Sequence, residues 1–305
     1  MVETRWHDER DEDDMDPAEA DRALSVFDDC RPRLFGIAYR MLGSVVEAED
    51  IVQDAWLRWQ QTDRSAVRNP HGFLTTMTTR LAINTAGSAR VRRETYVGPW
   101  LPEPVDTSAD PTLGAETAEA IQSAVLVLLE RVPARERAAY VLREAFAYDY
   151  ATIAGVLETS ETNVRQYVSR AKKHLASQRR APVDAAQVRA LLEAFLVAAR
   201  SGDLDGLERI LAEDVVSVSD GAGMVARAAR RPVTGRARVA RFVAGFADFF
   251  WTDTTTAWLT TNGAPSLLVS QHGEHVAVLS IDVSTDGIGQ LRWVMVPDKL
   301  TRLPS

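Results

Sequence analysis

The sequence predicts a multidomain protein in which two all-α helical modules are followed by an α+β domain. Apolar residues recur at helical spacings of three and four over most of the first 180 residues. The last third instead shows short β-rich runs of alternating character, separated by turn signals. Charge is partitioned as well, because residues 64–93 and 162–180 contain no acid and hold six Arg or Lys each, although the net charge is −8. The two basic strips predict contacts with a polyanion, one strip on each helical module.

Length and composition are those of a globular protein. The 305 residues are 46% hydrophobic and 26% charged, which suffices for two or three domains with buried cores. The single cysteine, Cys30, excludes an intramolecular disulfide framework and fits a reducing compartment. The longest aliphatic run, near residues 124–129, is too short to span a bilayer, so we expect a cytoplasmic protein with no membrane partner.

The amino terminus differs from the rest of the chain in its charge. Residues 1–16 carry eight acids and two arginines, the opposite of a secretory signal. We expect an acidic, disordered tail here. A shield for one of the basic surfaces is the alternative.

The first helical module is predicted over residues 17–97. Two amphipathic helices should lie on either side of the Gly43-Ser44 break, and a third should cover residues 71–85, after the Asn69-Pro70 boundary. The buried stripes of the three helices are predicted to be Leu34, Ile37, Ala38, Met41 and Leu42; Ala48, Ile51, Val52, Ala55 and Trp56; and Phe73, Leu74, Met77, Leu81 and Ala82.

A proline-rich linker is expected at residues 98–112. Its glycine and prolines cannot continue a helix and favour an extended backbone. Residues 100–105 are too apolar for a passive spacer, so this segment is expected to dock on another part of the molecule.

The second helical module is predicted over residues 113–182 and contains a helix-turn-helix pattern. Helices at residues 150–157 and 162–176 flank a three-residue turn, in which Ser160 is the expected N-cap. The second helix buries Val164, Val168, Ala171 and Leu175 and leaves its basic residues exposed, so its amino-terminal half should enter a DNA major groove. An antiparallel helical hairpin inside a core is the alternative.

Residues 183–305 form the predicted α+β domain. Helices are expected at residues 185–201 and 236–250, and turn signals stand at Asn262-Gly263, His272-Gly273 and Asp286-Gly287. A sheet of these strands could curve into a cone. The predicted strands are residues 215–219, 254–261, 266–271, 276–283 and 290–296.

The first basic strip follows an acidic helix that also carries Trp56 and Trp59. An acidic, aromatic helix beside a basic one suggests a module that meets protein on one side and DNA on the other, with a solvated helical bundle as the alternative. Short polar side chains near the basic surface could read unstacked bases. The acids are Glu47, Glu49, Asp50 and Asp54, and the polar residues are Asn69, His71, Asn84 and Thr85.

Two segments resemble a known family. The run LFGIAYRMLGSVVEAEDIVQDAWLRW, within residues 33–59, is similar to region 2 of extracytoplasmic-function RNA polymerase sigma factors, and residues 150–175 are similar to region 4. The resemblance implies core RNA polymerase and promoter DNA as partners. It implies that Asp50, Gln53, Asp54 and Trp56 contact the clamp coiled coil of the polymerase largest subunit. The resemblance implies that the minus-10 element is contacted by Arg64, Arg68, Asn69, Arg80, Asn84, Arg90, Arg92 and Arg93. It implies that the minus-35 element is contacted by Ser160, Thr162, Arg165, Gln166, Ser169, Arg170 and Lys173.

The linker and tail resemble those of the ECF41-type group, which carries a WLPEP linker and a cone-shaped SnoaL/NTF2-like domain. Two tail motifs are partly kept: DGAGM stands at residues 220–224 in place of DGGGK, and VPDKL at 296–300 in place of NPDKL. The lysine of the first motif is replaced by Met224. The resemblance implies a regulatory contact within the chain through Trp100, Leu101, Pro102, Glu103, Pro104, Asp220, Gly221, Gly223, Pro297, Asp298 and Lys299.

The expected function is that of a sigma factor that selects promoters and is regulated by its fused tail domain. We expect no enzyme activity, catalytic residue, cofactor or metal, although Asp220, Asp282 and Asp298 are available carboxylates and His272 and His275 flank a turn. The main alternative is a ligand-responsive helix-turn-helix regulator with a sensor domain, which leaves the first module without a role. An enzyme tethered to DNA is the third class.

Overall fold

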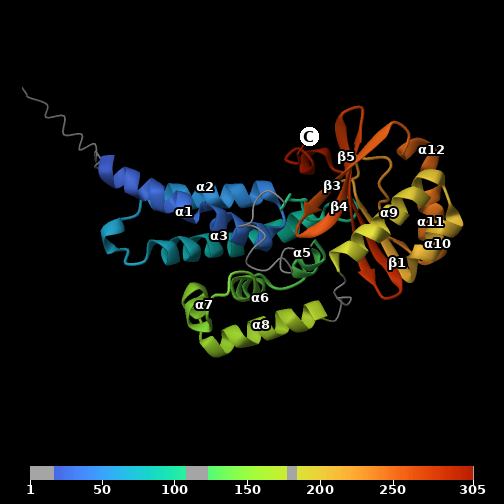
Figure 1. Cartoon of the computed structure of the whole chain (residues 1–305). Helices are drawn as coiled ribbons and strands as arrows, with labels where there is room; N and C mark the ends of the chain where they lie inside the picture. Colours follow the sequence, from blue (N-terminus) through green and yellow to red (C-terminus); the bar gives the residue numbers. More distant parts are fainter. Residues whose placement is uncertain (1–16, 108–122, 177–183, 305) are drawn as a thin grey trace, which may run out of the picture.

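A computed structural model describes residues 17–107, 123–176 and 184–304. The helical modules gather at one end of the molecule and the sheet at the other (Figure 1). The expectations for the acidic tail, for the end of the linker and for residues 177–183 fall outside the described residues. In the part of the chain that the structure describes, no helix is both long and apolar enough to cross a membrane.

The first module is built from α1 (Pro17–Leu42), α2 (Val45–Gln60) and α3 (Pro70–Glu94), with the 3-10 turn η1 (Arg64–Ala66) between α2 and α3. The Gly43-Ser44 break is confirmed, and the Ser44 hydroxyl caps α2 by accepting a hydrogen bond from the Glu47 amide. The predicted end of the third helix at residue 85 is wrong. The helix continues through Glu94 because Ala86 and Ala89 extend its buried face past Gly87.

The second module contains α5 (Ser123–Leu129), α6 (Ala134–Tyr140), a π-helical turn η3 (Val141–Ala145), α7 (Tyr150–Leu157) and α8 (Glu161–Ala176). The helix-turn-helix is confirmed at α7 and α8. Glu158 makes the turn possible by adopting a left-handed backbone with φ of 48°. The predicted stripe on α8 is buried, with Val164 and Ala171 fully inaccessible.

The two helical modules share one hydrophobic core. Ile37 and Leu42 of α1 belong to the same buried cluster as Leu126 of α5, Leu142 of η3 and Ile153 of α7. The two modules are therefore not independent of one another, because the second module packs against α1 and α3. A second cluster, which includes Leu34, Trp59 and Leu74, belongs to the first module alone.

The α+β domain is a six-stranded mixed sheet of order β2-β1-β6-β5-β4-β3, with helices against one face. The β1 and β6 strands run parallel and the other pairs are antiparallel. Sequence patterns did not predict α10, β2 or the break between α11 and α12. The elements are α9 (Ala185–Ser201), α10 (Leu204–Ile210), β1 (Leu211–Asp220), β2 (Val233–Thr234), α11 (Arg236–Ala244), α12 (Ala247–Phe250), β3 (Thr254–Thr261), β4 (Ala264–Gln271), β5 (Glu274–Ser284), β6 (Gly287–Val294) and the 3-10 turn η4 (Pro297–Lys299).

The two faces of the sheet bury different partners. One face packs on the C-terminal helices through a core that contains Phe195 and Trp293. The other face packs on the linker, because Leu101 joins Val218 and Val294 in a separate cluster and is only 2% exposed. Full burial of a leucine contributes about 2 kcal/mol, so the linker contact has an apolar centre.

Candidate nucleic-acid interfaces and the linker contact

The exposed face of α2 combines acids with apolar side chains. Asp50, Gln53 and Asp54 are exposed, as predicted for a protein-binding surface, and helical spacing places Val46 and Leu57 on the same face. Val46 is 54% exposed and Leu57 47% exposed, and sequence reasoning did not single them out. Trp56 is turned inward instead, with its ring centroid 4.9 Å from that of Phe27.

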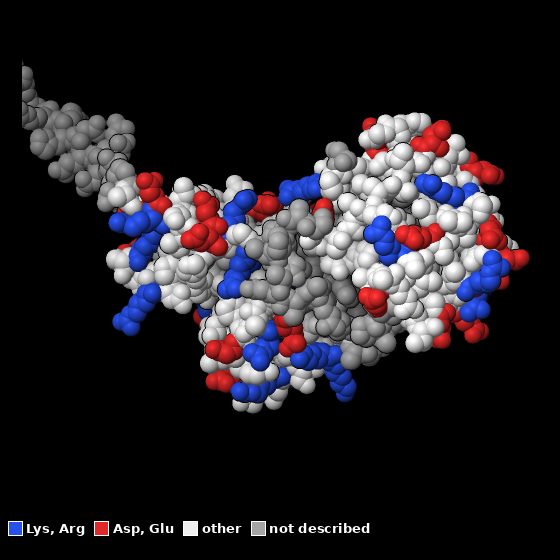
Figure 2. Space-filling model, viewed as in Figure 1, with Lys and Arg blue, Asp and Glu red and all other residues white. Residues whose placement is uncertain are grey.

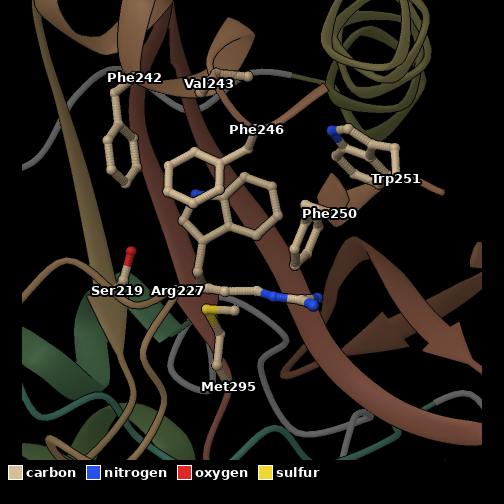
Figure 3. A pocket seen from close by; sticks show the side chains of 9 residues that line it. Ser219, Arg227, Phe242, Val243, Phe246, Phe250, Trp251 and Met295 are labelled. Carbon is tan, nitrogen blue, oxygen red and sulfur yellow. The ribbon is translucent and has the colours of Figure 1, made fainter. Parts of the chain in front are cut away.

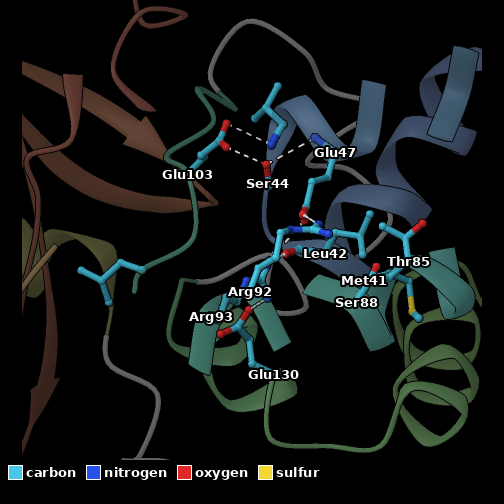
Figure 4. A network of polar contacts seen from close by, with 12 residues as sticks. Met41, Leu42, Ser44, Glu47, Thr85, Ser88, Arg92, Arg93, Glu103 and Glu130 are labelled. Atoms are coloured by element: carbon cyan, nitrogen blue, oxygen red, sulfur yellow. Dashed lines mark hydrogen bonds and ion pairs between the residues drawn. The ribbon is translucent and has the colours of Figure 1, made fainter. Parts of the chain in front are cut away.

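The first basic strip is free of acids in sequence but not in space. Glu47 of α2 pairs with both Arg92 and Arg93, and Glu130, beyond α5, also pairs with Arg93 (Figure 4). Arg93 donates to the Leu42 carbonyl as well and lies over the Trp100 ring at 3.7 Å. Burial lowers the pKa of Arg93 to about 10, and the attraction of Glu47 opposes that shift. This arginine joins α1, α3 and the linker within the folded chain.

The other residues predicted for the minus-10 element differ in whether their side chains already have partners within the protein. Arg64 pairs with Glu19 at 3.1 Å, and Asn69 caps α3 through the Gly72 amide. Arg80 is held by the second module: it pairs with Glu158 at 2.9 Å and donates to the Val156 carbonyl at 3.1 Å. Arg90 is exposed and pairs with Glu94, whereas Arg68 is exposed and forms no ion pair within the described residues. Asn84 is exposed as well.

The residues predicted for the minus-35 element form one exposed stripe along α8. Ser160 caps the helix by accepting from the Asn163 amide at 3.2 Å. Arg165 lies over the Tyr150 ring at 4.5 Å and pairs with Glu161, and Arg170 pairs with Glu136. Basic and acidic side chains are mixed over this edge of the molecule in Figure 2. The exposed stripe consists of Thr162, Arg165, Gln166, Ser169, Arg170 and Lys173.

Glu103 of the linker caps the start of α2. Its carboxylate accepts from the Ser44 hydroxyl at 2.7 Å and from the Val45 amide at 3.0 Å (Figure 4). A carboxylate at a helix amino terminus is favoured by the unpaired amides and the helix dipole. The Glu103 amide also donates to the Gly43 carbonyl at 2.9 Å. Glu103 therefore holds the linker on the first module both as a hydrogen-bond donor and as an acceptor.

Asp220 fixes the linker to the α+β domain. This carboxylate is fully buried and accepts from the Tyr96 hydroxyl at 2.6 Å, the Leu101 amide at 2.8 Å and the Lys299 ammonium at 2.8 Å. Lys299 donates in addition to the Leu101 carbonyl at 2.5 Å and lies over the Trp100 ring at 4.4 Å. We call Tyr96, Leu101, Asp220 and Lys299 the Asp220 cluster. A buried charge is tolerated there because it is paired and fully hydrogen-bonded.

Burial shifts the pKa of two residues of the Asp220 cluster, Tyr96 and Lys299. Burial raises the pKa of the Tyr96 phenol, and the hydrogen bond to Asp220 acts in the same direction. Burial also lowers the pKa of Lys299, while the attraction of Asp220 opposes that change. The cluster therefore holds its tyrosine neutral over a wider pH range than a free tyrosine.

A second contact between the linker and the α+β domain centres on Asn262. This residue is fully buried at the β3-β4 turn, and its side-chain oxygen accepts from the Val105 amide and the Tyr39 hydroxyl, both at 3.0 Å. Tyr39 also donates to the Glu103 carbonyl at 2.6 Å. The sequence identified Asn262 only as a turn residue and Glu47 only as one acid of the acidic helix, and it did not single out Tyr39 or Tyr96. Residues so far apart in the chain share no local pattern that could have paired them.

The remaining motif residues have smaller roles in the contact. Gly223 has φ of 70°, and an added Cβ would lie 2.6 Å from Val97, so glycine is favoured beside this last residue before the linker. Gly221, Pro102 and Pro104 are buried, whereas the side chains of Pro297 and Asp298 are exposed. Met224 is 69% exposed. Of the two tail motifs, Asp220 and Lys299 are the residues that bond to the linker.

Of the carboxylates and histidines considered for catalysis or metal binding, Asp298 and His272 are exposed, whereas Asp220, Asp282 and His275 have structural partners. Asp282 pairs with Arg292 at 2.5 Å, and His275 bonds to Ser270 at 3.0 Å. Within the described residues, no group of three or more His, Cys, Asp or Glu side chains is arranged to hold a metal ion.

Two family models match the helical part of the chain: Sigma-70 region 2 at residues 26–94 and Sigma-70, region 4 at residues 122–175. The chain is 40% identical over 231 residues to the ECF RNA polymerase sigma factor SigJ of Mycobacterium tuberculosis, which covers 74% of this chain and 73% of that protein. It is 28% identical over 279 residues to the probable ECF RNA polymerase sigma factor SigI of the same organism, covering 90% and 93%. The crystal structure of M. tuberculosis extracytoplasmic function sigma factor SigJ matches with a TM-score of 0.73 and 32% identity, covering 92% of this chain and 99% of that one.

Proposed function

The chain belongs to the ECF RNA polymerase sigma factors, and we propose that its α+β domain holds this sigma factor in a resting form by gripping the linker. A sigma factor binds core RNA polymerase and directs transcription initiation at promoters. The ligand-responsive regulator with a single helix-turn-helix is not favoured, because it leaves the region 2 match without a role.

The proposed polymerase contact is the exposed face of α2. Asp50, Gln53 and Asp54 supply the polar part of this face, and Val46 and Leu57 supply apolar area that a partner would bury. Trp56 supports the face from beneath through its contact with Phe27.

The proposed DNA contacts are divided between two kinds of surface. The exposed stripe on α8 suits the major groove of the minus-35 element, because a recognition helix presents base-reading side chains along one face. Arg68 and Asn84 are exposed and suit the minus-10 element directly. Arg80 would have to leave Glu158 and Val156 first, whereas Arg93 is proposed to support the fold.

The observation that carries the resting form is the engagement of Arg80 by the helix-turn-helix module. Arg80 lies on α3, and both of its partners lie at the end of α7 or just beyond it, so the two DNA-binding modules hold one another. Binding two promoter elements at once requires a set distance between these modules. The Asp220 cluster and Glu103 pin the linker that joins them. Release of the linker would therefore allow the modules to separate.

Fluorescence energy transfer between the two modules tests the resting form. The donor and acceptor dyes are attached to two introduced cysteines, Gln61→Cys and Gly155→Cys. Gln61 is exposed, and at Gly155 an added Cβ meets nothing within 4 Å. The background variant is Cys30→Ser. Transfer should be high in the free protein and fall when core polymerase and promoter DNA are added. Equal energy transfer in the free and promoter-bound forms would contradict the proposal.

A further inference from the structure

A third stretch of the chain without acids lies in the α+β domain, at residues 221–247. It holds six basic residues, as many as each of the two strips described above. The rest of the domain, residues 184–220 and 248–304, carries six basic and fourteen acidic residues. Positive charge is therefore gathered in one segment, which we call the arginine segment and which comprises the loop after β1, β2 and α11. Its basic residues are Arg227, Arg230, Arg231, Arg236, Arg238 and Arg241.

The arginine segment differs from the other two strips in its ion pairs. In those strips acids pair with Arg64, Arg80, Arg90, Arg92, Arg93, Arg165, Arg170 and Lys172. Within the described residues, by contrast, none of the six arginines of the arginine segment forms an ion pair, and all six are exposed. Like charges so close in the chain repel one another, so a partner that supplies negative charge is favoured at this segment.

Two of the six arginines are used by the domain itself. Arg227 lies over the Phe249 ring at 5.9 Å, beside the aromatic pocket drawn in Figure 3. Arg236 donates a hydrogen bond to the Leu211 carbonyl at 2.8 Å. The arginines that remain available to a partner are Arg230, Arg231, Arg238 and Arg241.

The helix α11 presents two of the available arginines together. Its buried face consists of Val239, Ala240 and Val243. Arg238 and Arg241 are three residues apart, so they lie side by side on the opposite, exposed face. Arg241 donates to the Ala237 carbonyl at 3.0 Å, which is a bond within its own helix. The exposed face of α11 is therefore basic and is not covered by an acid of the described residues.

The chain keeps the arginine segment close to any DNA that α8 binds. The recognition helix ends at Ala176 and α9 begins at Ala185, and the fully extended span of this connection is about 30 Å. In the α+β domain, α11 packs against α9. One turn of duplex is about 34–36 Å long, so DNA beside the minus-35 element lies within reach of the domain. Tethering also raises the effective concentration of the segment at that DNA.

We propose that the arginine segment binds the phosphate backbone of the duplex that flanks the minus-35 element. Its available guanidinium groups pair with phosphate oxygens through parallel hydrogen bonds. Phosphate contacts read no bases, so they add affinity and salt dependence without sequence preference. This proposal rests on the proposed contact of α8 with minus-35 DNA and is independent of the resting form.

Binding of the holoenzyme to two minus-35 duplexes tests the proposal. One duplex is trimmed to the element, and the other continues for about two helical turns on each side. The double variant Arg238→Gln, Arg241→Gln should bind the extended duplex about 10-fold more weakly near 0.1 M salt and lower the salt slope by about 2. It should bind the trimmed duplex within about 2-fold of the wild type. Glutamine is a good helix former, so the fold of α11 is kept.

The matched control is the double variant Arg189→Gln, Arg209→Gln. Both arginines are exposed on helices of the same domain, and they already pair with Glu193 and Asp203. The control removes the same charge from the domain and should keep the affinity for both duplexes within about 2-fold, since exposed ion pairs contribute little.

Three results would overturn the proposal. Equal affinity of the two double variants for the extended duplex is the first. The second is an equal loss on the trimmed and extended duplexes, which would assign the effect to the α8 contact. The third is a loss of affinity for core polymerase alone, which would assign the arginine segment to a protein partner. Wild-type holoenzyme that binds neither duplex would refute the minus-35 contact itself, and with it this proposal. The energy transfer between the modules bears on the resting form only.

Discussion

Replacing Asp220 by Asn should loosen the linker while keeping the size of the side chain. Asp220 is fully buried and accepts three hydrogen bonds, one of them from the Lys299 ammonium, whose side chain is 10% exposed. Asn has one acceptor oxygen, so at least one charge-assisted bond is lost and the buried ammonium is left without a neutralising charge. These losses amount to about 2–4 kcal/mol, or roughly 30-fold to 700-fold in the opening equilibrium.

Hydrogen exchange of the Leu101 amide measures this opening directly, because that amide donates to Asp220. In the Asp220→Asn variant it should exchange faster by about the same factor. The matched control is Asp298→Asn, whose carboxylate is exposed and belongs to the neighbouring motif, and it should exchange within about 2-fold of the wild type. A Lys299→Met substitution added to Asp220→Asn should restore part of the protection, since no unpaired charge remains buried. Equal Leu101 exchange in the Asp220 and Asp298 variants would refute the reasoning.

Three further changes test other contacts. Glu103→Gln should lower the free energy of unfolding by about 1–2 kcal/mol in urea titrations, because the charged cap of α2 is lost. A loss no larger than that of Glu213→Gln, at an exposed position, would contradict the cap. The raised pKa of Tyr96 means that the folded state keeps a proton that an unfolded tyrosine releases near pH 10, so stability should fall as the pH rises beyond about 10. Tyr96→Phe should make that fall shallower between about pH 9 and pH 11, and identical slopes would argue against it. Arg165→Gln in the holoenzyme should weaken binding to minus-35 duplex and lower the salt slope by about 1, while Arg209→Gln should change neither.

Local patterns predicted the helices, the turn of the helix-turn-helix and most strands, because apolar periodicity and caps are properties of neighbouring residues. The α3 helix ran past its predicted end since alanines continued its buried face beyond Gly87. The charge pattern was less informative about which basic residues are available to bind DNA. Absence of acids between residues 64 and 93 did not leave the strip free, because the fold brings Glu47 and Glu130 to Arg93 and brings Glu158 to Arg80.

The linker contact shows the same limit. Motif residues Asp220 and Lys299 were identified from the sequence, yet their partner Tyr96 was not, since 124 residues separate Tyr96 from Asp220. Asn262 reads as a turn residue by its neighbour Gly263 and its left-handed backbone. That its side chain also accepts from Tyr39 and Val105 depends on how the α+β domain docks, which no local pattern encodes.

Promoter-directed transcription by core RNA polymerase tests the central claim most directly. Reactions contain the wild type, Asp220→Asn or Asp298→Asn at equal concentrations of full-length protein, with core binding measured in parallel. We predict that Asp220→Asn raises the initial transcript yield at least about 3-fold at unchanged core affinity, and that Asp298→Asn behaves as the wild type. Yields that are equal for the two variants, or lower for Asp220→Asn, would contradict a resting form held by the α+β domain.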